Sequence, residues 1–229
     1  MSTISKEVAN LRLRILSMGE MAVEMVDKAV EACDSSNRYE LVQEVFEAES
    51  ALDQMQLEVD QEAVRTLTVH SPVASDLRFV ITVSRIVSEL ERIGDQANNL
   101  CEILQFAASK HVFDIDAQVE QMASIVAKML SDSLEAFVKN DVSLARATIA
   151  ADDLVDALND QITQDLLSDK LVRDAIAGEN SIVRGFIQVI VARALERIAD
   201  HATNISEEVI YIVKGEDIRH NDSDATKLN

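Results

Sequence analysis

Helix breakers, turn formers and aromatic residues are scarce in this chain of 229 residues. It contains one proline, Pro72, five glycines and no tryptophan, and aromatic residues make up only 3% of it. Proline and glycine interrupt helices and form the tight turns of β-proteins. Their scarcity therefore favours long helices over strands.

Basic residues and cysteines are also few. The chain has 21 Lys and Arg against 41 Asp and Glu, which gives a formal charge of −20. Nucleic acids and anionic membranes are bound through basic surfaces, so this charge argues against both and favours cations or basic protein patches as partners. Cys33 and Cys101 are isolated and belong to no CxxC pair, which fits a reducing compartment and a role as small core residues.

Long apolar runs are missing as well. A membrane span needs about 18 uncharged residues, whereas even the run GFIQVIVARAL is interrupted by Gln188 and Arg193. The opening stretch MSTISKEVANLRLRIL has no uninterrupted apolar segment followed by small residues, as a secretory signal peptide would have. We expect a soluble, cytoplasmic protein.

The most informative feature of the sequence is an internal repeat. The stretch LERIGDQANNLCE, from Leu90 to Glu102, returns as LERIADHATNISE, from Leu195 to Glu207, with eight identical residues. The second copy lies 105 positions after the first. A match at a fixed offset of nearly half the chain indicates one unit used twice.

Apolar residues recur in steps of three and four over six segments, which is the spacing of amphipathic helices. We predict helices over about 11–33, 38–70, 72–109, 122–140, 142–171 and 181–214. Pro72 is placed in the first turn of the third helix and Gly215 at the end of the sixth. The predicted fold is all-α, with two tandem pseudo-repeat three-helix bundles at 1–110 and 117–215, a linker at 111–116 and a polar tail at 216–229 that is poorly ordered after Arg219.

Acidic residues are paired at positions i and i+4 in both copies of the repeat, so both members of a pair face the same way. The preceding helix of each unit carries a similar pair, and antiparallel neighbours would bring four acids onto one face of each bundle. The pairs are Glu49 with Asp53, Glu91 with Asp95, Asp152 with Asp156, and Glu196 with Asp200.

Such pairs weaken a helix by roughly 0.2–0.5 kcal/mol each, and a hard cation between them would remove the penalty. Carboxylate oxygens suit Mg, Mn, Ca or oxidised Fe. The lack of nearby thiolate and histidine pairs disfavours a structural zinc site. The identity of the metal stays open among Mg, Mn, Fe and Zn. His201 follows Asp200, but its counterpart is Gln96, so we interpret it as a packing or surface residue.

An ordinary solvated face is the alternative interpretation of the acidic pairs, because the same spacing occurs elsewhere. Further pairs are Glu20 with Glu24, Glu58 with Glu62, and Asp165 with Asp169.

Enzyme motifs are missing from the sequence. It has no glycine-rich phosphate loop, GxSxG elbow or CxxC pair, and no histidine stands three residues after a glutamate, as a ferritin-like di-iron centre requires. We predict a protein that is not an enzyme. A metal-storage protein or metal-dependent enzyme built on the same acidic pairs is the alternative, and a structural helical module is a third.

The residues LERIGDQANN, LERIADHATNISEEVIYIVKGEDIRH and SPVASDLR (Ser71 to Arg78) resemble the PhoU family of phosphate-signalling regulators, over nearly the full chain. The resemblance implies two PhoU three-helix bundles and a motif of Glu or Asp, three residues, then Asp, which binds multinuclear metal clusters on the bundle surface. The motif maps onto the four acidic pairs above. Asp153 beside Asp152 leaves one ligand choice open.

The resemblance also implies a function. A PhoU protein would act without catalysis as an adaptor between the phosphate-specific ABC transporter and a sensor histidine kinase, and would restrain phosphate uptake and the phosphate-starvation response when phosphate is plentiful. It further implies a homodimer with at most a peripheral membrane association through its partners.

Overall fold

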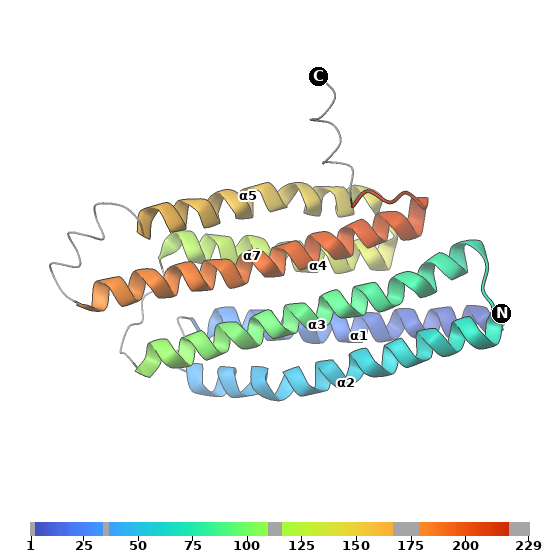
Figure 1. The fold of residues 1–229 in the computed structure, drawn as a ribbon, viewed down its shortest axis with the longest axis horizontal. Coiled ribbons are helices and arrows are strands. Elements are labelled where there is room, and N and C mark those ends of the chain that lie inside the picture. Colours follow the sequence, from blue (N-terminus) through green and yellow to red (C-terminus); the bar gives the residue numbers. More distant parts are fainter. Residues whose placement is uncertain (1–2, 34–36, 110–115, 167–178, 220–229) are drawn as a thin grey trace, which may run out of the picture.

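The computed structural model describes residues 3–33, 37–109, 116–166 and 179–219, and within these ranges the chain forms helices and no strands (Figure 1). This confirms the predicted all-α class. The helices are α1 (Thr3–Glu31), α2 (Arg38–His70), α3 (Ala74–Ser109), α4 (Ala117–Lys139), α5 (Val142–Leu166) and α7 (Glu179–Lys214).

The helices pack as two groups of three. Helices α1, α2 and α3 contact one another, as do α4, α5 and α7, and the groups meet along α3 and α7 and between α1 and α4. Figure 1 shows α2, α3, α7 and α5 side by side, with α1 and α4 behind them. The two predicted three-helix bundles are therefore present, with α3 and α7 at the centre of the molecule. Most of the predicted linker and tail lies outside the described residues, so the domain limits stay a prediction.

Four predicted helix starts are wrong. The first helix begins at Thr3, well before Leu11, the fourth at Ala117 rather than Met122, and the third at Ala74, after Pro72. Pro72 is not in the first helical turn, because the chain turns over residues 71–74: Ser71 (φ 45°) donates its N–H to the Leu67 carbonyl at 3.2 Å and Ala74 also has a positive φ of 49°. The predicted end of the fifth helix near residue 171 lies outside the described residues, and residues 179–180, predicted as part of a break, are helical.

Left-handed backbone conformations end α4 and α7, and a side chain caps the start of α5. Asn140 has a left-handed φ of 52° and closes α4, and Asp141 Oδ1 then accepts the N–H groups of Ser143 (2.8 Å) and Leu144 (3.1 Å) to cap α5. Gly215 has a φ of 73°, and its N–H donates to the Tyr211 carbonyl at 2.9 Å. This confirms Gly215 as the end of the sixth predicted helix.

The three-four stripes of α3 and α7 form much of the core. Each large aliphatic side chain buried there contributes roughly 1.5–3 kcal/mol. The fully buried positions include Leu90, Ile93, Ala97, Leu100 and Leu104 in α3 and Leu195, Ile198, Ala202, Ile205 and Val209 in α7. Because these stripes are buried, the paired acids on the same helices, Glu91 with Asp95 and Glu196 with Asp200, lie to the side of the stripes and are not fully buried.

Gly94 of α3 makes room for a side chain of α2. A Cβ added to Gly94 would lie 2.3 Å from Leu52 Cδ2, so any side chain at position 94 would displace the buried Leu52 side chain. The equivalent position in α7 is Ala199, which is fully buried. Gly94 precedes Asp95, so this close contact lies beside the acidic residues of α2 and α3.

Arg12 of α1 ties the two bundles together. Its guanidinium lies 4.9 Å from the ring centroids of both Phe79 in α3 and Phe137 in α4, and its Nη1 donates to the Phe137 carbonyl at 2.9 Å. Such cation–π contacts contribute about 0.5–2 kcal/mol each.

Cys101 lies in the core, and Cys33 is half-buried and donates its Sγ hydrogen to the Ala29 carbonyl at 3.4 Å. Burial raises the pKa of Cys101 to about 12. None of the described helices has an apolar stretch long enough to cross a membrane.

Candidate metal centres

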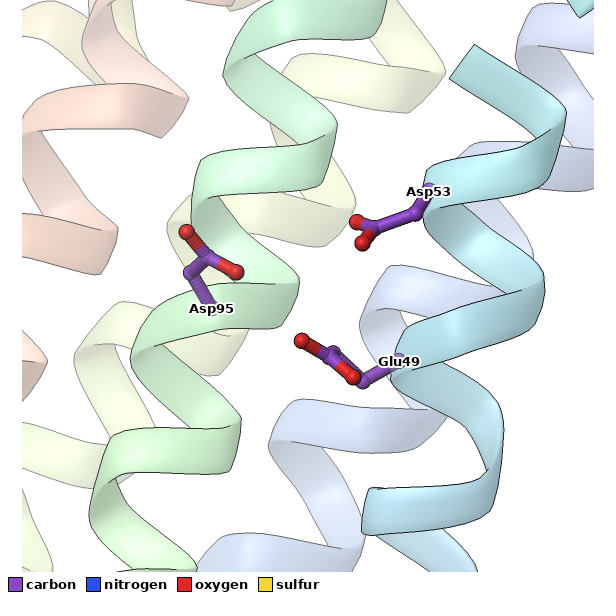
Figure 2. A group of neighbouring side chains, drawn as sticks. All are labelled: Glu49, Asp53 and Asp95. Carbon is purple, nitrogen blue, oxygen red and sulfur yellow. The ribbon is translucent and has the colours of Figure 1, made fainter. Parts of the chain in front are cut away.

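The structure brings the acidic pairs of α2 and α3 together into what we call the first cluster, which consists of Glu49, Asp53, Glu91 and Asp95. One carboxylate oxygen from each of Glu49, Asp53 and Asp95 lies within 4.8 Å of the others, and Figure 2 shows the three side chains converging between the two helices. Residues four apart on a helix share a face, and α2 and α3 pack against each other, so the i, i+4 spacing accounts for the convergence.

The electrostatics of the first cluster reflect its crowding. Burial, followed by the charges of Asp95 and Asp53, raises the pKa of Glu91. Burial and the charge of Asp53 likewise raise the pKa of Asp95. Ionised carboxylates are therefore held together at an energetic cost that a bound cation would remove.

The second cluster is made by the equivalent helices α5 and α7, and consists of Asp152, Asp156, Glu196 and Asp200. Burial raises the pKa of Asp152 to about 6, and the charges of the other three members and of the adjacent Asp153 contribute to the shift. The pKa values of Glu196 and Asp200 are raised by burial and then by neighbouring acids of the cluster.

The second cluster also contains an unsatisfied polar atom. Asp152 Oδ1 is buried and has no hydrogen-bond partner in the described part of the chain. Its neighbour Asp153 is exposed, so the structure favours Asp152 as the inward member of the pair left open by the sequence. A buried carboxylate oxygen without a partner is costly, and a cation would satisfy it.

Both clusters suit hard cations. Each offers only carboxylate oxygens, which Mg, Mn, Ca and oxidised Fe prefer, and neither contains a thiolate. The three converging oxygens of the first cluster and the unsatisfied oxygen of Asp152 are the features of this chain that fit a metal. Binding itself, and the ligand roles of the eight acids, stay predictions.

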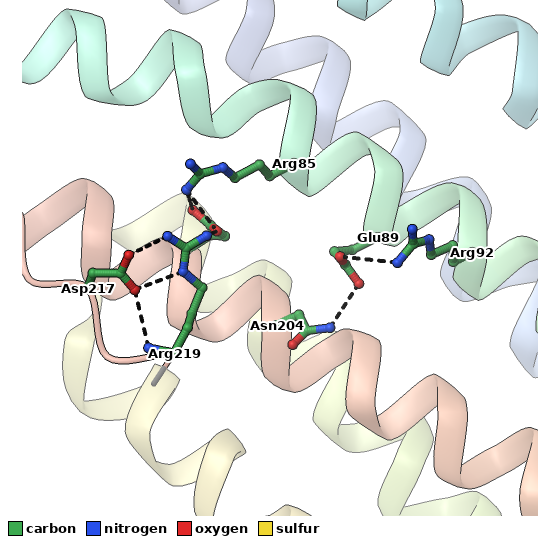
Figure 3. A network of polar contacts seen from close by, with 7 residues as sticks. Arg85, Glu89, Arg92, Asn204, Asp217 and Arg219 are labelled. Carbon is green, nitrogen blue, oxygen red and sulfur yellow. Dashed lines mark hydrogen bonds and ion pairs between the residues drawn. The ribbon is translucent and has the colours of Figure 1, made fainter. Parts of the chain in front are cut away.

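A polar contact missed by the sequence analysis connects α3 to α7 between the two clusters. His201 Nδ1 lies 2.7 Å from Glu89 Oε2, and Asn204 Nδ2 donates to the same oxygen at 3.1 Å. Arg92 approaches the other Glu89 oxygen at 3.9 Å (Figure 3). His201 is thus a largely buried residue of the interface, which favours packing over the surface in its interpretation as a packing or surface residue.

A second polar contact lies further along the same interface. Glu208 of α7 is almost fully buried and forms ion pairs with Arg85 of α3 at 3.3 Å and with Arg219 at 2.9 Å. Arg219 Nε in turn donates to Asp217 Oδ1 at 2.8 Å (Figure 3). The segment after α7 is therefore held against the junction of the two bundles.

Sequence periodicity did not identify Glu89 or Glu208, because their partners in the other helix are more than a hundred residues away. A comparison of the two copies does mark them. The positions equivalent to Glu89 and Glu208 hold Ala194 and Ile103, so these acids do not belong to the repeated pattern.

Comparison with known proteins identifies the family of this fold. The family model described as the PhoU domain matches the chain twice, over residues 15–104 and 119–209. A phosphate-specific transport system accessory protein PhoU homolog of Aquifex aeolicus is 33% identical over 94% of this chain and 95% of its own. The accessory protein PhoU of Escherichia coli is 30% identical over 93% of this chain and 86% of its own.

Solved structures agree with the sequence comparisons. The crystal structure of PhoU from Pseudomonas aeruginosa matches with a TM-score of 0.85 and 33% identity, covering 93% of this chain and all of that one. A phosphate transport system regulatory protein PhoU from Streptococcus pneumoniae matches with a TM-score of 0.83 and 27% identity, over 94% of this chain and 99% of its own. With both halves matched by the family model and relatives aligned over nearly their full length, the chain belongs to the PhoU family.

Proposed function

We propose that this protein regulates phosphate transport as a non-catalytic accessory protein. The observation that carries the proposal is its membership of the PhoU family over both repeats, since the relatives bear the name of the phosphate-specific transport system. In this proposal the protein works in the cytoplasm as an adaptor between the phosphate-specific ABC transporter and a sensor histidine kinase. It keeps phosphate uptake and the starvation response low while phosphate is plentiful.

The charge of the molecule supports an adaptor role. A formal charge of −20 on a rigid frame of long helices provides an extended acidic surface. Such a surface attracts basic patches on partner proteins, and charge complementarity of this kind speeds association and excludes wrong partners. The protein is proposed to act as a homodimer, which the family resemblance implies.

The metal belongs to this proposal as a structural or regulatory component. The eight carboxylates of the two clusters would hold hard cations, which would supply positive charge where acids crowd together. The chain's own contribution is to fix these carboxylates on packed helices, at the junctions of α2 with α3 and of α5 with α7. The alternative, metal storage or metal-dependent catalysis on the same acids, differs in predicting turnover or variable iron loading.

A reporter of the phosphate-starvation response tests the function. Deleting the gene is expected to switch the reporter on at high phosphate, and the wild-type gene should restore repression. A reporter that stays repressed in the deletion strain contradicts the proposed role.

The metal component is tested with Asp95→Asn combined with Asp200→Asn, which removes one acid from each cluster. The double variant is expected to lose bound metal in elemental analysis and to restore repression only in part. Glu20→Gln with Glu120→Gln is the matched control, since it removes the same charge from exposed positions of α1 and α4, the helices that carry no member of either cluster. Metal content at the wild-type level in the Asp95 and Asp200 variant would contradict the ligand assignment.

A further inference from the structure

His201 occupies the space between the two acidic clusters. It directly follows Asp200 of the second cluster, while its partner Glu89 stands two residues before Glu91 of the first. The two side chains meet at 2.7 Å and are only 15% and 16% exposed. Burial favours the neutral form of Glu89, but the hydrogen bonds from His201 and Asn204 hold its pKa below the ordinary value. Glu89 is therefore an ionised acceptor, to which His201 donates its Nδ1 proton.

The electrostatic reach of His201 extends to both clusters. Burial and neighbouring carboxylates raise the pKa of Asp95 in the first cluster and of Asp200 in the second, and in each case His201 partly offsets the rise. It also offsets part of the rise at Glu91. One side chain thus interacts with acids from both halves of the molecule.

The contact exists once, although the helices that carry it are repeated. The position equivalent to His201 in the first copy is Gln96, and the position equivalent to Glu89 in the second copy is Ala194. An alanine side chain has no polar atom, so Gln96 cannot make the corresponding contact with it. The Glu89–His201 hydrogen bond is therefore not a consequence of the repeat.

We propose that the Glu89–His201 hydrogen bond couples the two clusters, so that a cation bound at one cluster raises the affinity of the other. This inference rests on the metal binding proposed above. A cation at the second cluster holds Asp200 and hence the turn of α7 that carries His201. Through Glu89 that turn is bonded to the turn of α3 that carries Glu91, so the first cluster is already ordered when its own cation arrives.

The coupling has two properties that an experiment can use. It is reciprocal, because each cation must raise the affinity of the other by the same factor. It also opposes the direct repulsion between two bound cations, which salt weakens, since the screening length falls from about 10 Å at 0.1 M to about 3 Å at 1 M. Measurements at about 0.5 M salt therefore emphasise the contribution of the hydrogen bond.

Titration with Mn²⁺, followed by the electron paramagnetic resonance of the free ion, tests the inference. Three proteins are compared. They are the wild type, a protein that keeps only the first cluster because it carries Asp156→Asn and Asp200→Asn, and a protein that keeps only the second cluster because it carries Asp53→Asn and Asp95→Asn. Each is measured with and without His201→Gln, which installs the residue of the equivalent position. We expect each cluster to bind Mn²⁺ at least about 5-fold more tightly when the other is intact and loaded.

In the His201→Gln series this factor should fall below about 2-fold, while the Kd of each single-cluster protein stays unchanged. Glu89→Gln should reproduce the loss, and circular dichroism checks that both variants keep the wild-type helical content. Independent binding in the wild type, or equal coupling with and without His201, overturns the inference. So does a changed Kd in the single-cluster proteins with coupling intact, because His201 would then act through its charge alone. If no protein binds Mn²⁺, the proposed metal sites fail instead.

Discussion

At one end of the α3–α7 interface Arg85 of α3 forms an ion pair with Glu208 of α7, and at the other end the equivalent positions of the repeat hold Ile190 and Ile103. We call the part of the interface around Arg85 and Glu208 the polar half, and the part around Ile103 and Ile190 the apolar half. The isoleucines help to line an open pocket of about 420 Å³ between the end of α3 and the start of α7. Equivalent positions on equivalent helices thus carry an ion pair in one place and an aliphatic contact in the other.

The contrast extends to neighbouring positions. Arg78, Thr82 and Tyr211 of the polar half correspond to Val183, Ile187 and Phe106 of the apolar half. The full pocket lining is Glu102, Ile103, Phe106, Val183, Phe186, Ile187 and Ile190.

The comparison separates what the duplicated fold requires from what it tolerates. The buried stripes of α3 and α7 are apolar in both copies, because each must fill the core of its own bundle. The positions at the junction of the bundles only have to match the facing helix, so they can be polar or apolar. Ion pairs depend strongly on geometry and select one alignment of the helices, whereas apolar contacts contribute area without direction.

The largest effect is expected from breaking the polar half with Glu208→Ala. This change leaves Arg85 and Arg219 without their buried partner and should lower the free energy of unfolding by about 2–3 kcal/mol, as measured by urea denaturation. Burial raises the pKa of Glu208 in spite of the two arginines, so Glu208→Gln should cost less. Glu216→Ala, at an exposed position, is the control. A loss below about 0.5 kcal/mol for Glu208→Ala would show that the ion pairs do not stabilise the interface.

An intermediate effect is expected when the ion pair is transplanted to the apolar half. Ile103→Glu alone places a carboxylate in an apolar pocket and should destabilise the protein by about 2 kcal/mol. Adding Ile190→Arg should recover about 1 kcal/mol, if the facing positions are as close as the equivalence with Arg85 and Glu208 indicates. Urea denaturation of the two single variants and the double variant measures this coupling. Strictly additive losses would mean that the two halves differ in geometry as well as in chemistry.

The smallest effect is expected in the pH dependence of the second cluster. The pKa of Asp152 is about 6 in the folded protein, above its value of roughly 3.9 in an unfolded chain, so the folded state binds this proton more tightly. The corresponding stability is present below pH 4 and is lost as the pH rises through 6.

Metal-free protein should therefore gain about 1 kcal/mol between pH 7 and pH 5 from this group, after allowance for solvent screening at a half-exposed site. Asp152→Asn should remove the gain, with Asp160→Asn, at an exposed position of the same helix, as the control. Urea denaturation in the presence of a chelator measures both, and addition of Mn²⁺ at pH 7 should stabilise only proteins with an intact cluster. A gain that survives in Asp152→Asn would place the responsible proton elsewhere.

Much of the fold could be predicted because it depends on local spacing. The three-four stripe that includes Leu90, Ile93 and Ala97 marks a buried helix face, and Gly215 marks a helix end, wherever they occur. The wrong placement of Pro72 in the first turn of the third helix also has a local cause. Proline fits the first turn of a helix, but Ser71 and Ala74 adopt left-handed conformations. Residues other than glycine seldom take these conformations, so serine and alanine at these positions do not predict a turn.

The acidic clusters could be predicted only in part. The i, i+4 spacing places Asp53 beside Glu49, and Asp95 beside Glu91, on helix faces without any knowledge of the fold. That Asp53 and Asp95 meet depends on how α2 and α3 align, and Gly94 contributes to that alignment by admitting Leu52. The duplication made the prediction possible, because one hairpin geometry serves both clusters.

In Leu90–Glu102 and its repeat, helix periodicity alone places the apolar stripe inward and the paired acids beside it, because both follow from 3.6 residues per turn. Periodicity does not predict the contacts at the junction of the two bundles. Glu89 meets His201, and Arg85 meets Glu208, only because α3 and α7 pack in one alignment over more than a hundred residues of sequence separation. Arg85 and Glu89 share a face of α3, and His201 and Glu208 share a face of α7, but the period of one helix does not say which residues of the other helix they meet. Their partners are therefore decided by the packing of the whole molecule.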